Sequence, residues 1–380
     1  MIYLDHNATT PVREAVIAAM TPWWREACGN PQSQHGPGRL ARQAVDRARN
    51  QLRAAVAAPR DWEVIFTGSG TEADNLALHG LLQPGDDFLT SPVEHKAVLA
   101  AVPEGVTLHT FSVDSDGIAQ VAGEWPVAAP RLVSLMLANN ETGAIQPVAA
   151  VGALLAERPA LLHCDAVQAF GRLPIDVTAL GVDLISLSAH KIRGPKGVGA
   201  LICRPGLGLR PLIRGGSHEN TTRAGTHNVP GIVGFGVAAE LAAAEIADYA
   251  CHTSGLRDRL RAALLAALPW AAELAPTAPR LPNTLALAFP GCDTQTLLIQ
   301  LDRHEIAAGA GAACSAGGVD PSHVTLAMGL PPAQQKSVVR FSLGADTTAA
   351  EVDAVIPIII DIASRERTKR DDLRRQIYGE

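Results

Sequence analysis

A glycine turn between a predicted strand and a predicted helix is the first segment whose residue types could do chemistry. The run Phe66-Thr67-Gly68-Ser69-Gly70-Thr71-Glu72 follows a short apolar stretch and precedes a helical pattern that begins near Thr71. Glycines allow the tight turn, and free backbone N–H groups at a helix N-terminus attract a phosphate. The Thr71 hydroxyl would cap the helix or donate to that phosphate. The same residues fit two other interpretations. One is a simple turn with a helix cap, and the other is a loose dinucleotide-binding fingerprint in which Glu94 is the acidic residue.

An acidic residue ends the second segment of interest. Asp165 follows the apolar run Leu162-His163-Cys164 in a stretch that reads as buried. A buried carboxylate is costly unless it meets a cation. The pyridinium nitrogen of pyridoxal 5'-phosphate (PLP) is such a cation, and its chemistry needs a carboxylate that keeps the ring protonated. An aspartate that only caps the next turn is an equal alternative on this feature alone.

The third segment contains a lysine among small and polar residues. Lys191 lies in Ser188-Ala189-His190-Lys191, between two apolar runs and 26 residues after Asp165. This setting favours a nucleophile that forms a Schiff base. Lys196 is the competing lysine, but its place between Pro195 and Gly197 indicates a turn. The order of phosphate turn, strand-end aspartate and lysine is typical of fold-type-I PLP enzymes.

One cysteine stands in a segment that predicts mobility. Cys314 lies in Gly309-Ala310-Gly311-Ala312-Ala313-Cys314-Ser315-Ala316-Gly317-Gly318, whose small residues cannot pack tightly. We expect a flexible loop that carries a thiol into and out of a site. The thiol needs activation toward thiolate, since its ordinary pKa is about 8.5. The other cysteines are interpreted as buried residues that only fill space in the core: Cys28, Cys164, Cys203, Cys251 and Cys292.

Short apolar runs separated by helical or turn stretches must position these residues. They predict a mostly parallel sheet covered on both faces by helices. Residues 38–58 predict an amphipathic helix, and residues 231–268 predict an alanine-rich helical stretch long enough to bridge two domains. Residues 283–289 alternate like a half-exposed strand, 338–343 predict another strand, and an amphipathic helix follows from Thr348.

This pattern predicts an α/β protein with two domains. The large PLP-binding α/β domain would span residues 15–245. A smaller α+β domain would combine residues 1–14 with 246–380 and carry the Cys314 loop.

Composition limits the function classes. The chain of 380 residues is 47% apolar and 18% charged, enough for a substantial interior. Its net charge of −6 gives no sign of nucleic-acid binding. No apolar run reaches the length of a membrane span, no signal peptide is visible, and the cysteines show no metal-site spacing. We therefore expect a cytoplasmic enzyme without a metal site.

The chain resembles the cysteine desulfurases from Tyr3 to about Thr348, with its motifs in family order. The motifs that carry the resemblance are Leu4-Asp5-His6-Asn7-Ala8-Thr9-Thr10, Gly29-Asn30-Pro31, Thr71-Glu72-Ala73-Asp74-Asn75, Val93-Glu94-His95, Asn139-Asn140-Glu141-Thr142-Gly143, Ser188-Ala189-His190-Lys191, Arg223-Ala224-Gly225-Thr226, Leu281-Pro282-Asn283-Thr284, Ala313-Cys314-Ser315 and Arg340-Phe341-Ser342-Leu343-Gly344. The stretch around Cys314 is similar to the class with the longer catalytic loop, which serves iron–sulfur assembly. The resemblance implies a fold-type-I PLP enzyme that converts L-cysteine to L-alanine and leaves the sulfur on Cys314 as a persulfide.

The resemblance also implies roles for single residues. Lys191 would hold PLP and move the Cα proton, Asp165 would pair with the ring nitrogen, and His95 would stack on the ring and act as acid or base. Gln168 and Asn140 would contact the phenolic oxygen of the ring, and Asn140 would also contact the substrate. The phosphate would be bound by Gly70, Thr71, Ser188 and His190. Arg340 would grip the substrate carboxylate with its planar fork.

Partners follow from the same resemblance. Thr226 would reach the phosphate of the partner subunit's cofactor, which implies a homodimer. The persulfide sulfur would pass to an iron–sulfur scaffold or another acceptor protein.

Several positions depart from the family pattern. Serines are common where Gly309, Ala310, Ala312 and Ala316 stand. Arg193 replaces a usual aromatic residue, Leu137 a frequent histidine and Ser217 a frequent glycine. These departures bear on rate and partner preference, since none removes a named catalytic group.

Three alternatives remain open at the level of sequence. A selenocysteine lyase shares every motif and differs in whether Cys314 is dispensable. A catalytically silent sulfur-transfer scaffold would lack the yellow colour of bound cofactor. An NAD oxidoreductase would use the glycine turn but leaves Lys191 and Cys314 unexplained.

Overall fold

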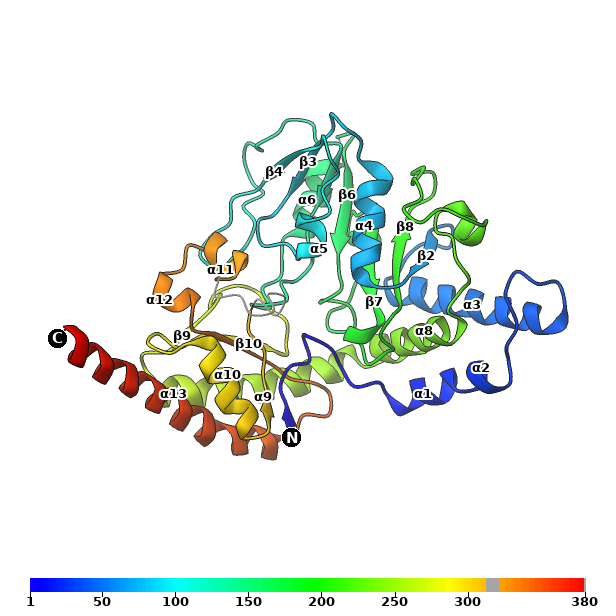
Figure 1. Ribbon diagram of the computed structural model, residues 1–380. Coiled ribbons are helices and arrows are strands. Elements are labelled where there is room, and N and C mark those ends of the chain that lie inside the picture. The colour runs from blue at the N-terminus through cyan, green and yellow to red at the C-terminus, as the bar shows by residue number, and fades with distance from the viewer. Residues whose placement is uncertain (157, 312–320, 379–380) are drawn as a thin grey trace.

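A seven-stranded sheet forms the centre of the computed structural model, which describes residues 1–156, 158–311 and 321–378 (Figure 1). The strand order is β2-β8-β7-β6-β5-β3-β4. The strands are β2 (Glu63–Thr67), β3 (Asp87–Thr90), β4 (Thr107–Thr110), β5 (Leu132–Ser134), β6 (Leu161–Asp165), β7 (Leu184–Ser188) and β8 (Gly199–Cys203). From β4 to β7 all neighbours pair in parallel, and β8 runs antiparallel to both β7 and β2. The predicted mostly parallel α/β sheet is confirmed.

Both faces of this sheet are buried at β5, β6, β7 and β8, which explains why these strands are mostly apolar runs in the sequence, whereas the edge strand β4 is mostly exposed. Successive side chains of a strand point to opposite faces, so Leu184 joins one core and Ile185 the other. Helix α4 (Gly70–Leu81) covers the first face. Helices α3 (Gly36–Ala55) and α8 (Val229–Ala244) pack together over the second.

Shorter helices complete this region. They are α1 (Glu14–Met20), α2 (Pro22–Arg25), α5 (Lys96–Leu99), α6 (Val148–Leu155), α7 (Val177–Leu180) and the 3-10 turns Ala189–Lys191 and His218–Thr221.

A second region lies at the lower left of Figure 1 around its own core. Its antiparallel sheet has the order β12-β10-β9, formed by Val338–Ser342, Thr284–Ala288 and Ala272–Glu273. The helices beside it are α9 (Ile246–Ala267), α10 (Thr294–Arg303), α11 (His323–Ala327), α12 (Pro332–Gln335) and α13 (Ala349–Tyr378). The N-terminal strand β1 (Ile2–Tyr3) pairs in parallel with β11 (Ile306–Ala307). The N-terminal strand therefore lies within the second region, and Leu4 packs in the core of that region.

The division into domains at residues 14/15 and 245/246 stays a prediction. Separate hydrophobic clusters pack against the two sheets, and the N-terminal strand pairs with β11 in the second region.

Two expectations about single elements are wrong in part. The stretch 231–268 is helical but breaks at Glu245, and α8 and α9 are bent by 71° because they pack against different regions. The strand at 283–289 is not half-exposed: Thr284 to Ala288 are all buried, because β10 is flanked by β9 and β12 and packs against α9.

The expectations for the cysteines are also correct for some residues and wrong for others. Cys164, Cys203 and Cys292 are buried, as predicted for filler. Cys28 and Cys251 are exposed, so the interpretation as buried filler is wrong for these two.

No single helix in the described ranges is long and apolar enough to cross a membrane. Helices α8 and α9 meet the length and composition requirement only as the bent pair.

Candidate active site

A cavity of about 290 Å³ brings most of the predicted site residues together. It opens where β6 and β7 end, beside the turn that leads from β2 into α4. The predicted residues that line it are Gly70, Thr71, His95, Asn140, Asp165, Gln168, Ser188, His190, Lys191 and Arg340. Ligands in open α/β sheets bind at the carboxyl ends of the strands, and this cavity follows that rule.

The turn before α4 differs in one detail from the expectation. The helix begins at Gly70, and its cap is Ser69, whose hydroxyl accepts the N–H of Glu72 at 3.1 Å. Thr71 is therefore not the cap, because Ser69 already holds that position. The exposed Thr71 hydroxyl lies at the cavity instead.

Two features of this corner fit a phosphate. The Ser188 hydroxyl oxygen is buried and has no hydrogen-bond partner among the described residues. A Cβ atom at Gly70 would lie 2.8 Å from Val167 Cγ2, so only glycine lets the backbone sit this deep. An anion at the α4 N-terminus would satisfy the Ser188 hydroxyl and the helix N–H groups together.

Asp165 is a buried carboxylate with no ion-pair partner in the described part of the chain. It is the last residue of β6, and its Oδ1 accepts the Val167 N–H at 2.9 Å. Burial raises the pKa of the Asp165 carboxyl, while the nearby His95 and Lys191 oppose that rise. A cationic ring nitrogen in the cavity would remove this cost.

Lys191 presents its amine to the same cavity. It follows β7 on the 3-10 turn Ala189–Lys191, and its Nζ donates to the carbonyl oxygens of Asn7 and Ala8, the latter at 2.9 Å. Burial, followed by the charges of Arg172 and Arg340, lowers the pKa of the Lys191 amine to about 7. A buried amine with this pKa is a good nucleophile near neutral pH. Lys196, the competing lysine, is exposed and does not line the cavity.

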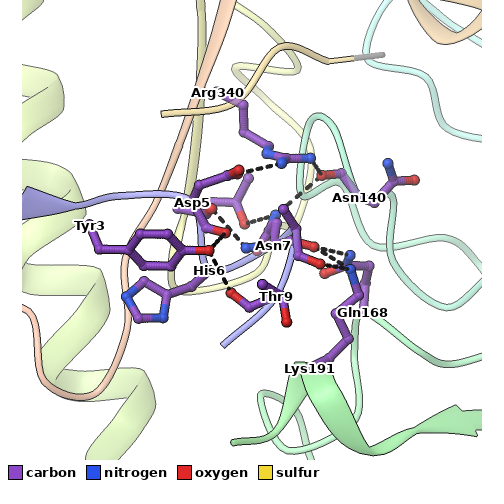
Figure 2. A network of polar contacts seen from close by, with 12 residues as sticks. Tyr3, Asp5, His6, Asn7, Thr9, Asn140, Gln168, Lys191 and Arg340 are labelled. Atoms are coloured by element: carbon purple, nitrogen blue, oxygen red, sulfur yellow. Dashed lines mark hydrogen bonds and ion pairs between the residues drawn. The ribbon is translucent and has the colours of Figure 1, made fainter. Parts of the chain in front are cut away.

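Asn7, in the N-terminal segment, is hydrogen-bonded to several residues of the site and was not predicted as a site residue. The Asn7 carbonyl accepts from both Lys191 and Gln168, the latter at 2.9 Å (Figure 2). Its side chain donates to the Asn140 carbonyl at 3.2 Å and accepts from Arg172 at 2.9 Å. The only signal in the sequence was membership of the motif Leu4 to Thr10.

Arg340 is buried beside these contacts of Asn7. Its Nη1 donates to the Asn140 carbonyl at 2.8 Å, and its Nη2 pairs with Asp5 Oδ1 at 2.6 Å (Figure 2). The guanidinium Nε is buried without a hydrogen-bond partner in the described ranges. The guanidinium has five N–H donors and these two contacts use two of them, so donors that include Nε–H remain for an anionic group in the cavity.

Two histidines flank the predicted ring position. Burial lowers the pKa of His95, which caps α5 by accepting the Ala97 N–H at Nδ1, 3.1 Å away. Burial and the charges of Lys191 and Lys196 lower the pKa of His190 to about 4. Both imidazoles are therefore neutral at pH 7.

A second carboxyl group of the cavity wall, Asp74, was not predicted. It lies on α4, is buried, and its Oδ1 has no hydrogen bond within the described ranges. Burial and the neighbouring Asp165 charge raise its pKa well above the ordinary value. Two carboxyl groups this close in a dry site do not ionise together readily.

One predicted residue is not brought to the cavity, and another cannot be placed. Thr226 is exposed and does not line it. Cys314 lies outside the described residues. The described chain on either side borders the cavity near Glu141, whose Oε2 accepts the Ser322 hydroxyl at 2.7 Å and would meet a Cβ at Gly311 at 2.5 Å.

The departures from the family pattern have local explanations at three positions. Leu137 is buried in the core of the large sheet. Arg193 pairs with Asp346 at 2.5 Å. A Cβ at Gly309 would lie 2.7 Å from both Arg340 Nη2 and Asp5 Oδ1, so glycine leaves room for that ion pair.

Residues 2–355 match the family described as aminotransferase class-V, and the chain belongs to this PLP-dependent family. Within the family it groups with the cysteine desulfurases. A cysteine desulfurase of Cereibacter sphaeroides is 44% identical over 376 residues, covering 96% of each chain.

Solved structures agree in fold. A NifS-like protein has a TM-score of 0.87 at 36% identity and covers 96% of this chain and 99% of its own. A structure titled SspA in complex with cysteine has a TM-score of 0.77 at 29% identity and covers 92% of this chain and 100% of its own. The predicted fold-type-I arrangement and the predicted PLP dependence are confirmed.

Proposed function

We propose that this cysteine desulfurase uses Lys191, Asp165, Arg340 and Cys314 to convert L-cysteine to L-alanine and a protein-bound persulfide. One observation carries the assignment of the cavity: a nucleophilic amine, a buried carboxylate without an ion-pair partner among the described residues, and an arginine whose Nε has no hydrogen-bond partner among them line the same space. The SspA relative solved with cysteine supports L-cysteine as the ligand of such a site.

The residues at the strand ends would hold the cofactor. PLP, when bound, supplies an electron sink for the carbanion formed at Cα. Lys191 would bind the cofactor through Nζ and later take the Cα proton. Asp165 would keep the ring nitrogen protonated, and His95 would lie against the ring. Gln168 and Asn140 would contact the phenolic oxygen, and the phosphate would be held by Gly70, Thr71, Ser188 and His190.

Arg340 would orient the substrate. Its buried Nε has no hydrogen-bond partner in the described ranges and would donate to the α-carboxylate, while its ion pair with Asp5 would hold the plane of the guanidinium. A charge-assisted hydrogen bond in a buried site contributes about 1.5–3 kcal/mol. This contact would hold the Cα–H bond of L-cysteine near the Lys191 amine.

Cys314 would take the sulfur. Its thiolate would attack the substrate sulfur and form an S–S bond, while the Cβ–S bond breaks and Cβ keeps the electron pair and takes a proton. The products would be L-alanine and a persulfide on Cys314. The position of Gly311 and Ser322 beside Glu141, at the cavity, supports this assignment.

Two variants test these roles. Lys191→Ala should lose both the visible absorbance of the bound cofactor and the release of alanine. Cys314→Ala should keep the absorbance and lose persulfide formation and sulfide release, whereas Cys251→Ala, at an exposed cysteine, should behave as wild type. Wild-type desulfuration rates in Cys314→Ala would show that the nucleophile is wrongly assigned.

The homodimer belongs to the same proposal. Thr226 is exposed and outside the cavity of its own chain, as expected for a residue that serves a partner's phosphate. A mixed dimer of Lys191→Ala and Thr226→Ala chains should contain one site with both native residues. That site should bind PLP with wild-type affinity. If neither site of the mixed dimer does so, Thr226 does not contact the cofactor of the partner subunit.

The sulfur acceptor would be an iron–sulfur scaffold or another carrier protein in the cytoplasm. Transfer of labelled sulfur from the Cys314 persulfide to a cysteine-bearing scaffold protein, lost when the scaffold cysteines are replaced by serine, tests this step.

A further inference from the structure

His323 is a third histidine of the cavity wall, besides His95 and His190, and the assigned roles leave it unused. It is the first residue of α11 and lines the cavity together with His95 and Glu141. Its Nε2 contacts the backbone of Glu94, next to His95, and its neighbour Ser322 donates to Glu141, so the three groups lie close together.

The hydrogen bonds of His323 determine its tautomer. Its Nε2 lies 2.8 Å from the backbone carbonyl oxygen of Glu94. A carbonyl only accepts, so Nε2 must carry the hydrogen. In the neutral ring Nδ1 then has a free lone pair, and Nδ1 is buried with no hydrogen-bond partner among the described residues.

His95 has the opposite arrangement. Its Nδ1 accepts the Ala97 N–H, so the hydrogen of its neutral ring is on Nε2. His95 therefore offers a donor, whereas His323 offers an acceptor. A site that moves protons in both directions needs one group of each kind.

We propose that His323 Nδ1 accepts the thiol proton of bound L-cysteine. With the carboxylate at Arg340 and the amino group near Lys191, the side chain of L-cysteine would extend toward other polar residues of the cavity wall, among them His95, Glu141 and His323. The Cys314 thiolate bonds to the substrate sulfur, the Cβ–S electron pair stays on Cβ, and the S–H proton passes to Nδ1. The persulfide is left as an anion and His323 as a cation. This step rests on the proposed function.

The same chemistry makes His323 a specificity residue. A selenol is ionised at neutral pH and carries no proton that Nδ1 could accept. L-cysteine therefore depends on His323, and L-selenocysteine does not.

The experiment compares the two substrates in His323→Gln, with His304→Gln as an exposed control. Glutamine keeps a donor for the Glu94 carbonyl and an acceptor for the thiol but cannot take a proton. Sulfide and selenide release are measured on holoenzyme, with cofactor absorbance and circular dichroism as checks of loading and folding. We expect kcat for L-cysteine to fall about 100-fold, KM to change less than about threefold, and kcat for L-selenocysteine to change less than about threefold.

Equal losses with both substrates would show a structural role and overturn the proposal. A fall of less than about tenfold with L-cysteine would overturn it as well. His323→Asn is measured in the same way if His323→Gln does not hold the cofactor. Wild-type protein that releases no sulfide from L-cysteine would instead refute the proposed function, and the His323 step with it.

Discussion

Asp5 Oδ1 and Arg340 Nη2 form an ion pair of 2.6 Å that joins the first residues of the chain to strand β12 at the edge of the cavity. Arg340 is almost fully buried, whereas Asp5 is partly exposed. The pair holds the guanidinium plane before any substrate arrives, and Nε has no hydrogen-bond partner within the described part of the chain. The orientation of the substrate-binding group is thus set by a residue 335 positions away in the sequence.

Arg340→Lys should separate substrate binding from cofactor binding. A lysine keeps the charge but not the planar fork that satisfies Asp5 and a carboxylate together. We expect KM for L-cysteine to rise about 10-fold to 100-fold, with cofactor absorbance unchanged, in steady-state assays of alanine formation. An unchanged KM would mean that the carboxylate binds elsewhere.

Gly309→Ala should disturb the same ion pair from the outside. The added Cβ would lie 2.7 Å from both charged atoms, so one of them must move. We expect KM for L-cysteine to rise about tenfold, equal to 1.4 kcal/mol. Gly255→Ala, where a Cβ meets nothing within 4 Å, is the control.

The rate at which apoenzyme captures PLP should rise with pH around neutrality. Lys191 has a pKa of about 7, lowered by burial and then by Arg172 and Arg340, and only the neutral amine attacks an aldehyde. Between pH 6 and pH 8 the neutral fraction rises from about one tenth to about nine tenths, so stopped-flow capture should accelerate about tenfold. Arg340→Gln removes one lowering charge and should move the midpoint to higher pH; a pH-independent rate would contradict the assignment.

Asp74→Asn should stabilise the apoprotein at high pH and not at low pH. Burial, followed by the Asp165 charge, raises the pKa of Asp74 in the folded state. The stability linked to its protonation is complete below the unfolded pKa near 3.8 and is lost as pH rises toward the folded value. The variant cannot ionise, so its advantage in free energy of unfolding should grow by up to about 1.4 kcal/mol per pH unit in that window.

Urea unfolding at pH 4, 6 and 8 measures this difference. Asp61→Asn, at an exposed position, should stay parallel to wild type. A constant offset for Asp74→Asn across the three pH values would show that Asp74 does not carry the proton.

Gly70→Ala should weaken cofactor binding without unfolding the chain. Its Cβ would lie 2.8 Å from Val167 Cγ2 and 3.4 Å from Ser188 Cβ, where the phosphate is proposed to sit. We expect the Kd for PLP, measured by equilibrium dialysis, to rise at least about tenfold. Gly36→Ala is a matched control, because Gly36 is also the first residue of its helix and its Cβ would meet nothing within 4 Å. Equal affinity in both variants would remove Gly70 from the phosphate site.

Local sequence was sufficient for much of the architecture. Strand β12 covers most of the predicted 338–343, and α3 covers most of the predicted 38–58, because apolar periodicity reports directly on burial. The break at Glu245 was not predictable, because the residues on its two sides are similarly rich in alanine. The 71° bend depends on which core each helix joins.

The residue types of the site were likewise visible in the sequence, since Asp165 ends a buried strand, Lys191 follows another, and Gly70 begins a helix. Their neighbours were decided only by the tertiary structure. Asn7 bonds to Thr284, 277 positions away, and the His323 tautomer depends on a carbonyl 229 positions away. Spacing along the chain carries information about one helix or strand at a time. Contacts between distant segments depend on how the two sheets and the N-terminal strand pack together.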